Sequence, residues 1–187
     1  MNHPTFRRWP RRGRATGQSL VEFALTLPIF SLVLMGVIEF GFLYNNLLTV
    51  QFSARQGVSA AAQAGGVDGA DCSILNAIEV ALATPVDRTD IDRVEIFRSD
   101  TNGDPIGSEL NVYTRGGTLT CVGTDDQPYT LSGSEGYPQV TRKDSLAEGL
   151  DIVGVRIHYD YHAITPVGAG RTWDLTDAAT LRMEPKQ

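Results

Sequence analysis

A long stretch without charged residues near the N-terminus constrains this chain more than any other feature. Phe23 to Ile38 contains no charged side chain, and Glu39 alone separates it from a second uncharged stretch, Phe40 to Ala54. As a helix, the segment from Phe23 to Tyr44 would be about 33 Å long, which is enough to cross a bilayer. The sequence therefore predicts a transmembrane segment at about residues 23–44.

Charge is distributed unevenly on the two sides of this segment. Residues 1–17 are basic and contain no acidic residue, whereas the rest of the 187-residue chain has twice as many acidic as basic residues, and the net charge is −6. The basic residues are Arg7, Arg8, Arg11, Arg12 and Arg14. Because basic flanks stay in the cytoplasm, we expect a single-pass protein of the cytoplasmic membrane with residues 65–187 outside. The acidic balance argues against nucleic acid as a partner.

The helix is expected to continue beyond the membrane. Apolar residues recur at helical spacing, and Gly65-Gly66 is a plausible end. This stripe consists of Leu43, Leu47, Val50, Ala54, Val58 and Ala61. A helix over residues 18–64 would therefore place its first half in lipid and lay the stripe of its second half on the outer domain. A transmembrane anchor followed by a short separate helix is the alternative.

A short motif precedes the uncharged stretch. Gly17 ends the basic leader, residues 1–17, and Glu22 and Phe23 follow after four residues that begin with Gln18. This pattern resembles the processing motif of type IVb prepilins, which implies that a membrane-embedded prepilin peptidase cuts between Gly17 and Gln18. The alternative is that Glu22 marks the membrane boundary and forms a capping box with Ser19.

The resemblance extends along the apolar run. The residues from Gly17 to Phe30, and those from Gly36 to Gly41, are similar to the N-terminal segment of TadE-like proteins, pseudopilins of the Tad (Flp pilus) assembly system. The resemblance implies a structural role in the assembly, initiation or tip capping of a surface pilus, with other pilins, pseudopilins and the Tad machinery as partners. It also implies that the Glu22 carboxylate forms an ion pair with the N-terminal amine of a neighbouring subunit. The chain length favours a minor component, since the major Flp pilins are much shorter.

Four residues of the apolar run are candidates for a role in assembly. Pro28 removes a backbone donor, which makes it either a weak point that lets the helix leave the bilayer or a simple kink. Glu39 is either a contact with a partner subunit or a carboxylate that reaches the outer headgroups. Gly36 and Gly41 would permit close approach of a second helix.

The acidic body predicts an α+β domain. A short helix is expected at residues 71–82, and residues 115–148 are expected to be rich in loops with short strands. Strands are expected at residues 91–98, 110–114, 153–161 and 173–183. Strands that follow one long helix favour a small antiparallel sheet packed on the outer half of that helix, which is also the layout of pilin-like proteins.

Two cysteines fall in this outer body. Cys72 and Cys121 are the only cysteines of the chain. Because an extracytoplasmic compartment permits disulfides, we expect them to form a bridge that closes a loop of about fifty residues. Two free thiols are the alternative.

No motif predicts catalysis, a cofactor or a metal. His158, Asp160 and His162 share one strand face, but the two histidines would lie about 13 Å apart along an extended strand, too far for one metal. Residues 100–104 resemble the start of a calcium loop, but Pro105 stands where glycine is required. We therefore expect a structural protein. The main alternative is an unprocessed single-pass surface protein with an extracellular binding domain.

Overall fold

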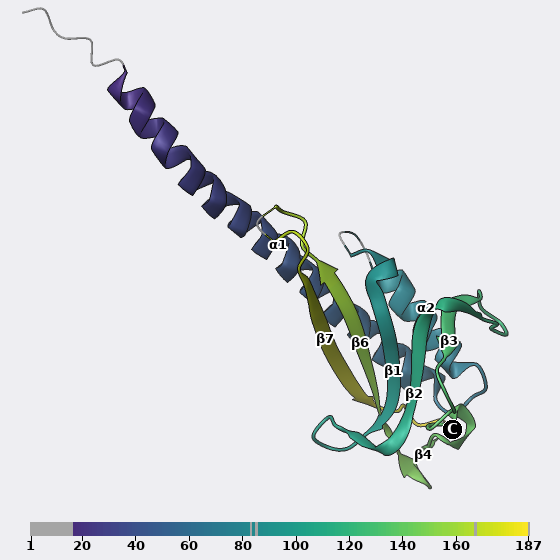
Figure 1. Cartoon of the computed structure of the whole chain (residues 1–187). Helices are drawn as coiled ribbons and strands as arrows, with labels where there is room; N and C mark the ends of the chain where they lie inside the picture. The colour runs from purple at the N-terminus through teal and green to yellow at the C-terminus, as the bar shows by residue number, and fades with distance from the viewer. Residues whose placement is uncertain (1–16, 83, 85, 167, 187) are drawn as a thin grey trace, which may run out of the picture.

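A single helix, far longer than any other element, runs beside a five-stranded sheet (Figure 1). The structure, a computed structural model, describes residues 17–82, 84, 86–166 and 168–186; of the expected leader it includes only Gly17. The helices are α1 (Gln18–Ala64) and α2 (Ala70–Ala81), with the short 3-10 helices η1 (Arg88–Asp90) and η2 (Gln139–Thr141). The strands are β1 (Ile91–Ser99), β2 (Pro105–Leu119), β3 (Gln127–Leu131), β4 (Asp144–Ser145), β5 (Gly149–Leu150), β6 (Ile152–His162) and β7 (Thr172–Arg182).

The main sheet has the strand order β3-β2-β1-β6-β7, and every neighbouring pair is antiparallel. β1 and β2 form one hairpin, with Val94 opposite Tyr113, and β6 and β7 form another. β1 also pairs with β6, where Val94 lies opposite Ile157, and this pairing joins the two hairpins into one sheet. The expected α+β class, a long helix packed on a small antiparallel sheet, is confirmed.

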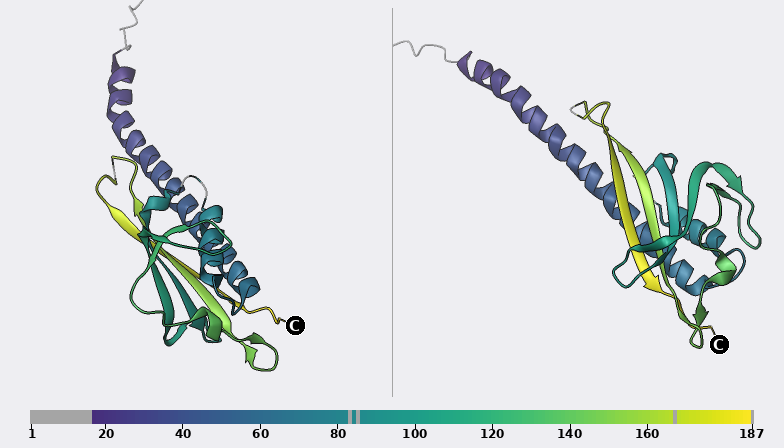
Figure 2. Two further views of the ribbon diagram at one scale, coloured as in Figure 1. Left: turned by 90° about the vertical axis from the view of Figure 1, so that its right-hand side faces the viewer. Right: turned by 60° about the horizontal axis from the view of Figure 1, so that its bottom comes forward.

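The two halves of α1 have different surroundings. The domain half (residues 43–64) packs on β6, β7 and α2 through the expected apolar stripe, in which Val50, Ala54 and Ala61 are fully buried. The anchor half (residues 18–42) extends away from the sheet (Figure 2). α1 is one continuous helix, so the alternative of an anchor followed by a separate short helix is wrong.

Close packing of α1 depends on a glycine in its domain half. A Cβ atom at Gly57 would lie only 2.8 Å from Ile78 Cγ1 of α2 and 3.3 Å from Val155 Cγ1 of β6. Contacts this short would force the neighbouring side chains to move, so the glycine allows α1 to approach the helix and the sheet at the same point.

The core lies between the two helices and one face of the sheet. β6 alternates as expected, so that Val153, Val155 and Ile157 point toward the helices and are fully buried. Ile74 and Leu75 of α2 cover the other side of this core and are also fully buried. Burial of each such side chain contributes about 1.5–3 kcal/mol to folding.

The end of α1 and the end of the chain lie together. Gly66 N donates to a carboxylate oxygen of Asp144 at 2.9 Å. Glu184 N donates to the carbonyl of Ala62 at 3.1 Å, and Lys186 Nζ donates to that of Ala64 at 2.6 Å. These bonds lie at the end of the domain that is farthest from the start of α1, next to β4 (Figure 1).

One strand is much longer than the sequence predicts. β2 spans Pro105–Leu119, although only residues 110–114 were expected to be extended. Gly116 has a φ of +105°, and the register of β2 against β3 shifts between Arg115 and Leu119. This irregular stretch interrupts the alternation of apolar residues that marks a strand, which explains why its continuation was not expected.

Candidate functional site

The anchor half of α1 carries a continuous apolar surface. Large apolar side chains from Leu20 to Phe42 are exposed, and those of Leu20, Phe30 and Phe40 are each about two-thirds exposed. None of the apolar window in this helix is buried by other described residues, and the helix is long and apolar enough to cross a membrane. A single N-terminal apolar helix of this kind fits a single-pass membrane anchor.

The candidate processing residues lie at the beginning of α1. Gln18 is the first helical residue, and Gly17 precedes it as the N-cap. The carbonyl of Gly17 accepts from Val21 N at 3.2 Å, and Gln18 Nε2 donates to Glu22 Oε1 at 3.0 Å. No side chain of the described residues caps this helix, so the capping box of Ser19 and Glu22 is wrong: both residues lie inside the helix. Phe23 is exposed on the apolar surface.

The candidate assembly residues lie within the anchor half. No heavy atom of the described residues lies within 4 Å of a Cβ placed at Gly36 or at Gly41, beyond the helix's own backbone. Both positions are therefore free for another helix to approach. Pro28 lies inside the helix and cannot donate to the carbonyl of Ala24, four residues earlier. The roles of these three residues in assembly stay predictions.

Glu39 is bound by the connection between β6 and β7. Glu39 Oε1 accepts from the hydroxyl of Tyr161 at 2.7 Å and from Ile164 N at 3.2 Å, and Oε2 accepts from Thr165 N at 2.7 Å. Burial, followed by the hydrogen bond to the Glu39 carboxylate, raises the pKa of Tyr161, so its hydroxyl stays protonated and donates. The carboxylate is therefore occupied by the chain's own domain and joins the helix to the sheet.

A glycine packs at the same junction, the contact between Glu39 of α1 and the connection from β6 to β7. Gly168 is buried, and a Cβ placed there would lie 2.7 Å from the Cβ of Ala163 and 3.7 Å from the carboxylate carbon of Glu39. Gly168 N donates to the carbonyl of Thr165 at 3.1 Å. The turn therefore folds tightly over the helix at the level of Glu39.

The hydroxyl of Tyr161 is expected to stabilise this junction. Tyr161→Phe should lower the free energy of unfolding of the full chain in detergent by about 1.5–3 kcal/mol, the usual contribution of a hydrogen bond to a charged group. Denaturant unfolding measures it. Tyr44→Phe is the matched control. Because Tyr44 is more than half exposed on the helix, this change should lower the free energy of unfolding only slightly. Equal losses in the two variants would contradict the assigned role of the Tyr161 hydroxyl.

The sequence pointed to Glu39 but not to its partners. Tyr161, Ile164 and Thr165 follow it in the chain by more than 120 residues. Two of the three bonds come from backbone N–H groups, which every residue other than proline possesses. No pattern in the sequence marks such donors, so the pairing became visible only in the folded chain.

The two cysteines are joined by a disulfide. It links Cys72, at the start of α2, to Cys121, just beyond the end of β2, and the Cα atoms are 5.9 Å apart. The bridge ties the short helix to the edge of the sheet next to β3. Disulfides persist in oxidising compartments, so the bridge agrees with an extracytoplasmic location for the domain.

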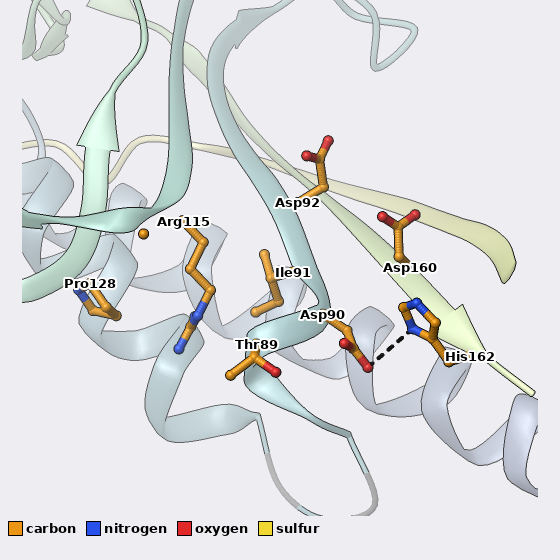
Figure 3. Close-up of a pocket in the computed structure, with 9 residues that line it drawn as sticks. Thr89, Asp90, Ile91, Asp92, Arg115, Pro128, Asp160 and His162 are labelled. Atoms are coloured by element: carbon orange, nitrogen blue, oxygen red, sulfur yellow. Dashed lines mark ion pairs between the residues drawn. The ribbon is translucent and has the colours of Figure 1, made fainter. Parts of the chain in front are cut away.

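A polar groove of about 490 Å³ opens between η1 and the ends of β1, β2, β3 and β6 (Figure 3). His162 Nδ1 lies 3.5 Å from a carboxylate oxygen of Asp90, and burial raises the pKa of Asp90. The hydroxyl of Thr89, which also lines the groove, donates to Asp87 at 2.7 Å instead of approaching the histidine. The residues that line the groove therefore offer no nucleophile paired with a base.

The histidines and aspartate of β6 do not converge on one point. Asp160 and His162 line the groove, whereas His158 Nε2 lies 3.2 Å from Glu95 and its Nδ1 lies 3.0 Å from the hydroxyl of Thr176. In the part of the chain that the structure describes, no three His, Cys, Asp or Glu side chains are placed to hold a metal ion. The Asp100 carboxylate accepts from the N–H groups of Asn102 and Asp104, which makes an ordinary turn.

In the part of the chain that the structure describes, the fold is a small α+β domain on one N-terminal apolar helix, which fits a single-pass membrane anchor. The family model of TadE-like proteins matches residues 17–66, which are α1 and the glycines on either side of it. This match covers about a quarter of the chain; α1 is therefore similar to the TadE-like family, which suggests a protein associated with Tad pili. Neither the curated proteins nor the solved structures give a match to the chain.

Proposed function

We propose that this chain is a minor pseudopilin that takes part in the assembly of a Tad-type surface pilus. The observation that carries the proposal is the TadE-like helix, which begins at the residue after Gly17 and leaves its apolar half uncovered. An apolar surface of this length needs lipid or other helices to cover it. Prepilin peptidase, pilins of the same system and membrane lipid are therefore the partners we infer.

Charge and redox chemistry support one orientation in the membrane. The five arginines before Gly17 keep the leader in the cytoplasm, and the disulfide between Cys72 and Cys121 supports a domain on the outer side. In this arrangement prepilin peptidase removes residues 1–17, and the new amino group at Gln18 is one helical turn from Glu22. Glu22 has no cationic partner among the described residues, which leaves its carboxylate for the amine of a neighbouring subunit.

Self-association is proposed to run through the anchor half of α1. Gly36 and Gly41 lie open on its surface and permit close helix packing. Pro28 removes one backbone hydrogen bond, which makes the helix easier to bend when it leaves the bilayer for a bundle. The domain half is already occupied by the sheet, so assembly through α1 leaves the fold of the domain unchanged.

The N-terminal residue of the membrane-bound protein tests this function. Intact mass and N-terminal sequencing are expected to give Gln18 in cells that contain the host's prepilin peptidase and Met1 in cells that lack it. Gly17→Val should block cleavage and abolish pilus assembly, because a branched side chain replaces the smallest residue at the scissile bond. Gly13→Val, in the same leader, is the matched control and should be cleaved normally.

A start at Met1 in both strains would overturn the proposal. It would favour the alternative, an unprocessed surface protein whose outer domain binds a partner. A start near Gly65 would instead indicate a secreted domain that has lost the whole helix. Normal pilus assembly with the uncleaved Gly17→Val protein would also contradict processing as a requirement.

A further inference from the structure

A single carboxylate interrupts the apolar surface of α1 about one bilayer thickness from its start. From Leu20 to Ile38 the helix is about 29 Å long, and the hydrocarbon core of a bilayer is about 30 Å thick. Glu39 is the next residue, and it is the only charged residue of the helix between Glu22 and Arg55. A helix that spans the membrane from Leu20 onward therefore places Glu22 near the inner boundary of the hydrocarbon and Glu39 at its outer boundary.

The β6–β7 loop (residues 163–166 and 168–171) is fixed at the same depth. Its N–H groups at Ile164 and Thr165 donate to Glu39, and Gly168 packs beside that carboxylate. A loop with unpaired polar backbone groups is energetically unfavourable in the hydrocarbon of a bilayer. These contacts favour a loop that lies level with the lipid headgroups and a span that ends at Glu39, whereas the sequence predicts a limit at about Tyr44.

The surface at this level has the composition of a membrane interface. The side chain of Ile164 is 61% exposed, and Arg171 of the same loop is exposed as well. On the helix, Phe40 and Tyr44 are exposed and stack with their ring centres 6.3 Å apart. Aromatic rings concentrate at the interface, and arginine is attracted by anionic headgroups.

We propose that the β6–β7 loop docks on the headgroups of the outer leaflet, with Ile164 inserted between them and Arg171 beside a lipid phosphate. The inference rests on the membrane anchoring in the proposed function and adds a second contact with the same membrane. Anchor and loop together hold the sheet domain directly on the bilayer at one orientation. The β4–β5 hairpin, at the opposite end of the domain, then points away from the membrane (Figure 1).

Single introduced cysteines in the full-length chain test the docking. The native cysteines are joined in a disulfide, so Ile164→Cys, Leu146→Cys and Val33→Cys can each be labelled selectively with an environment-sensitive fluorophore. Leu146, between β4 and β5, is the matched control, because it is also an exposed aliphatic residue (76%). The label at Val33 tests whether the anchor half of α1 lies in the lipid. The protein is reconstituted in vesicles of phosphatidylcholine and phosphatidylglycerol that contain headgroup-labelled or acyl-chain nitroxide lipids.

The label at Ile164 is expected to be quenched several-fold more strongly by the headgroup nitroxide than the label at Leu146, and to emit at shorter wavelength. The label at Val33 should respond to the acyl-chain nitroxide. Equal quenching at Ile164 and Leu146, with Val33 in lipid, would overturn the docking and leave the anchor intact. A Val33 label that stays in water would refute the membrane anchor and, with it, the docking.

Discussion

Arg142→Met is expected to lower the free energy of unfolding of the full chain in detergent by about 3–5 kcal/mol, the usual cost of removing one partner of a buried ion pair. Arg142 Nη2 lies 2.6 Å from Asp71 Oδ1, and the two side chains are 0% and 1% exposed. Methionine fills a similar volume but leaves the Asp71 carboxylate buried without its counter-ion.

The surrounding hydrogen bonds show why the loss should be large. The other oxygen of Asp71 accepts from Asn111 at 2.9 Å and from the hydroxyl of Tyr113 at 2.7 Å, while Arg142 donates to the carbonyl of Tyr137. Burial, and then the charge of Asp71, raise the pKa of Tyr113 and keep its hydroxyl a donor. This network joins α2 to β2 and to the segment that follows η2.

Denaturant unfolding of the purified full chain measures the effect. Arg93→Met is the matched control. Arg93 is more than one-third exposed and pairs with Asp92 and Glu95, and Glu95 keeps Arg156 as a partner, so this change should lower the free energy of unfolding by less than about 1 kcal/mol. Adding Asp71→Asn to Arg142→Met should restore part of the loss, because the isolated carboxylate is gone. Similar losses for Arg142→Met and Arg93→Met would contradict a buried pair.

Removal of the disulfide by the double change Cys72→Ser and Cys121→Ser is expected to lower the free energy of unfolding by about 4 kcal/mol. The bridge closes a loop with a sequence separation of 49 residues, and the chain-entropy model gives a cost of this size for such a loop. Because the bridge restricts the unfolded chain, the folded domain should keep its secondary structure while its denaturation midpoint falls.

A reducing agent provides the control for this prediction. Thiol reductant should lower the stability of the wild-type chain by the same amount as the double substitution and should leave the stability of the double variant unchanged. If the reductant changes the wild-type stability by less than about 1 kcal/mol, the disulfide does not stabilise the domain.

The elements that the sequence predicted correctly are those in which apolar residues recur at a regular spacing. The stripe from Leu43 to Ala61 repeats at helical spacing, and Val153 to Tyr161 alternates at strand spacing, so α1 and β6 were expected near their observed bounds. In both elements one face is buried and the other meets solvent. Because of that difference, apolar and polar residues alternate with the period of the helix or the strand.

The parts that the sequence missed depend on contacts between distant residues. β2 continues through Gly116 and Gly117, because Arg115 and Leu119 pair with β3 on either side of them, although the side chains show no alternation. The partners of Glu39 are mainly backbone N–H groups, and the pair of Asp71 with Arg142 joins residues about seventy positions apart. Charge complementarity between two side chains becomes specific only after the fold brings them together.

The attachment of α1 at both ends of the domain has a mechanical consequence. Near its middle the helix is tied to the β6–β7 loop through Glu39, and at its end Gly66 is tied to Asp144 and Ala64 to Lys186. Tension applied along α1 loads these contacts and the packed stripe in shear and at the same time. They cannot be peeled apart one after another, so the domain resists being stripped from the helix that carries it.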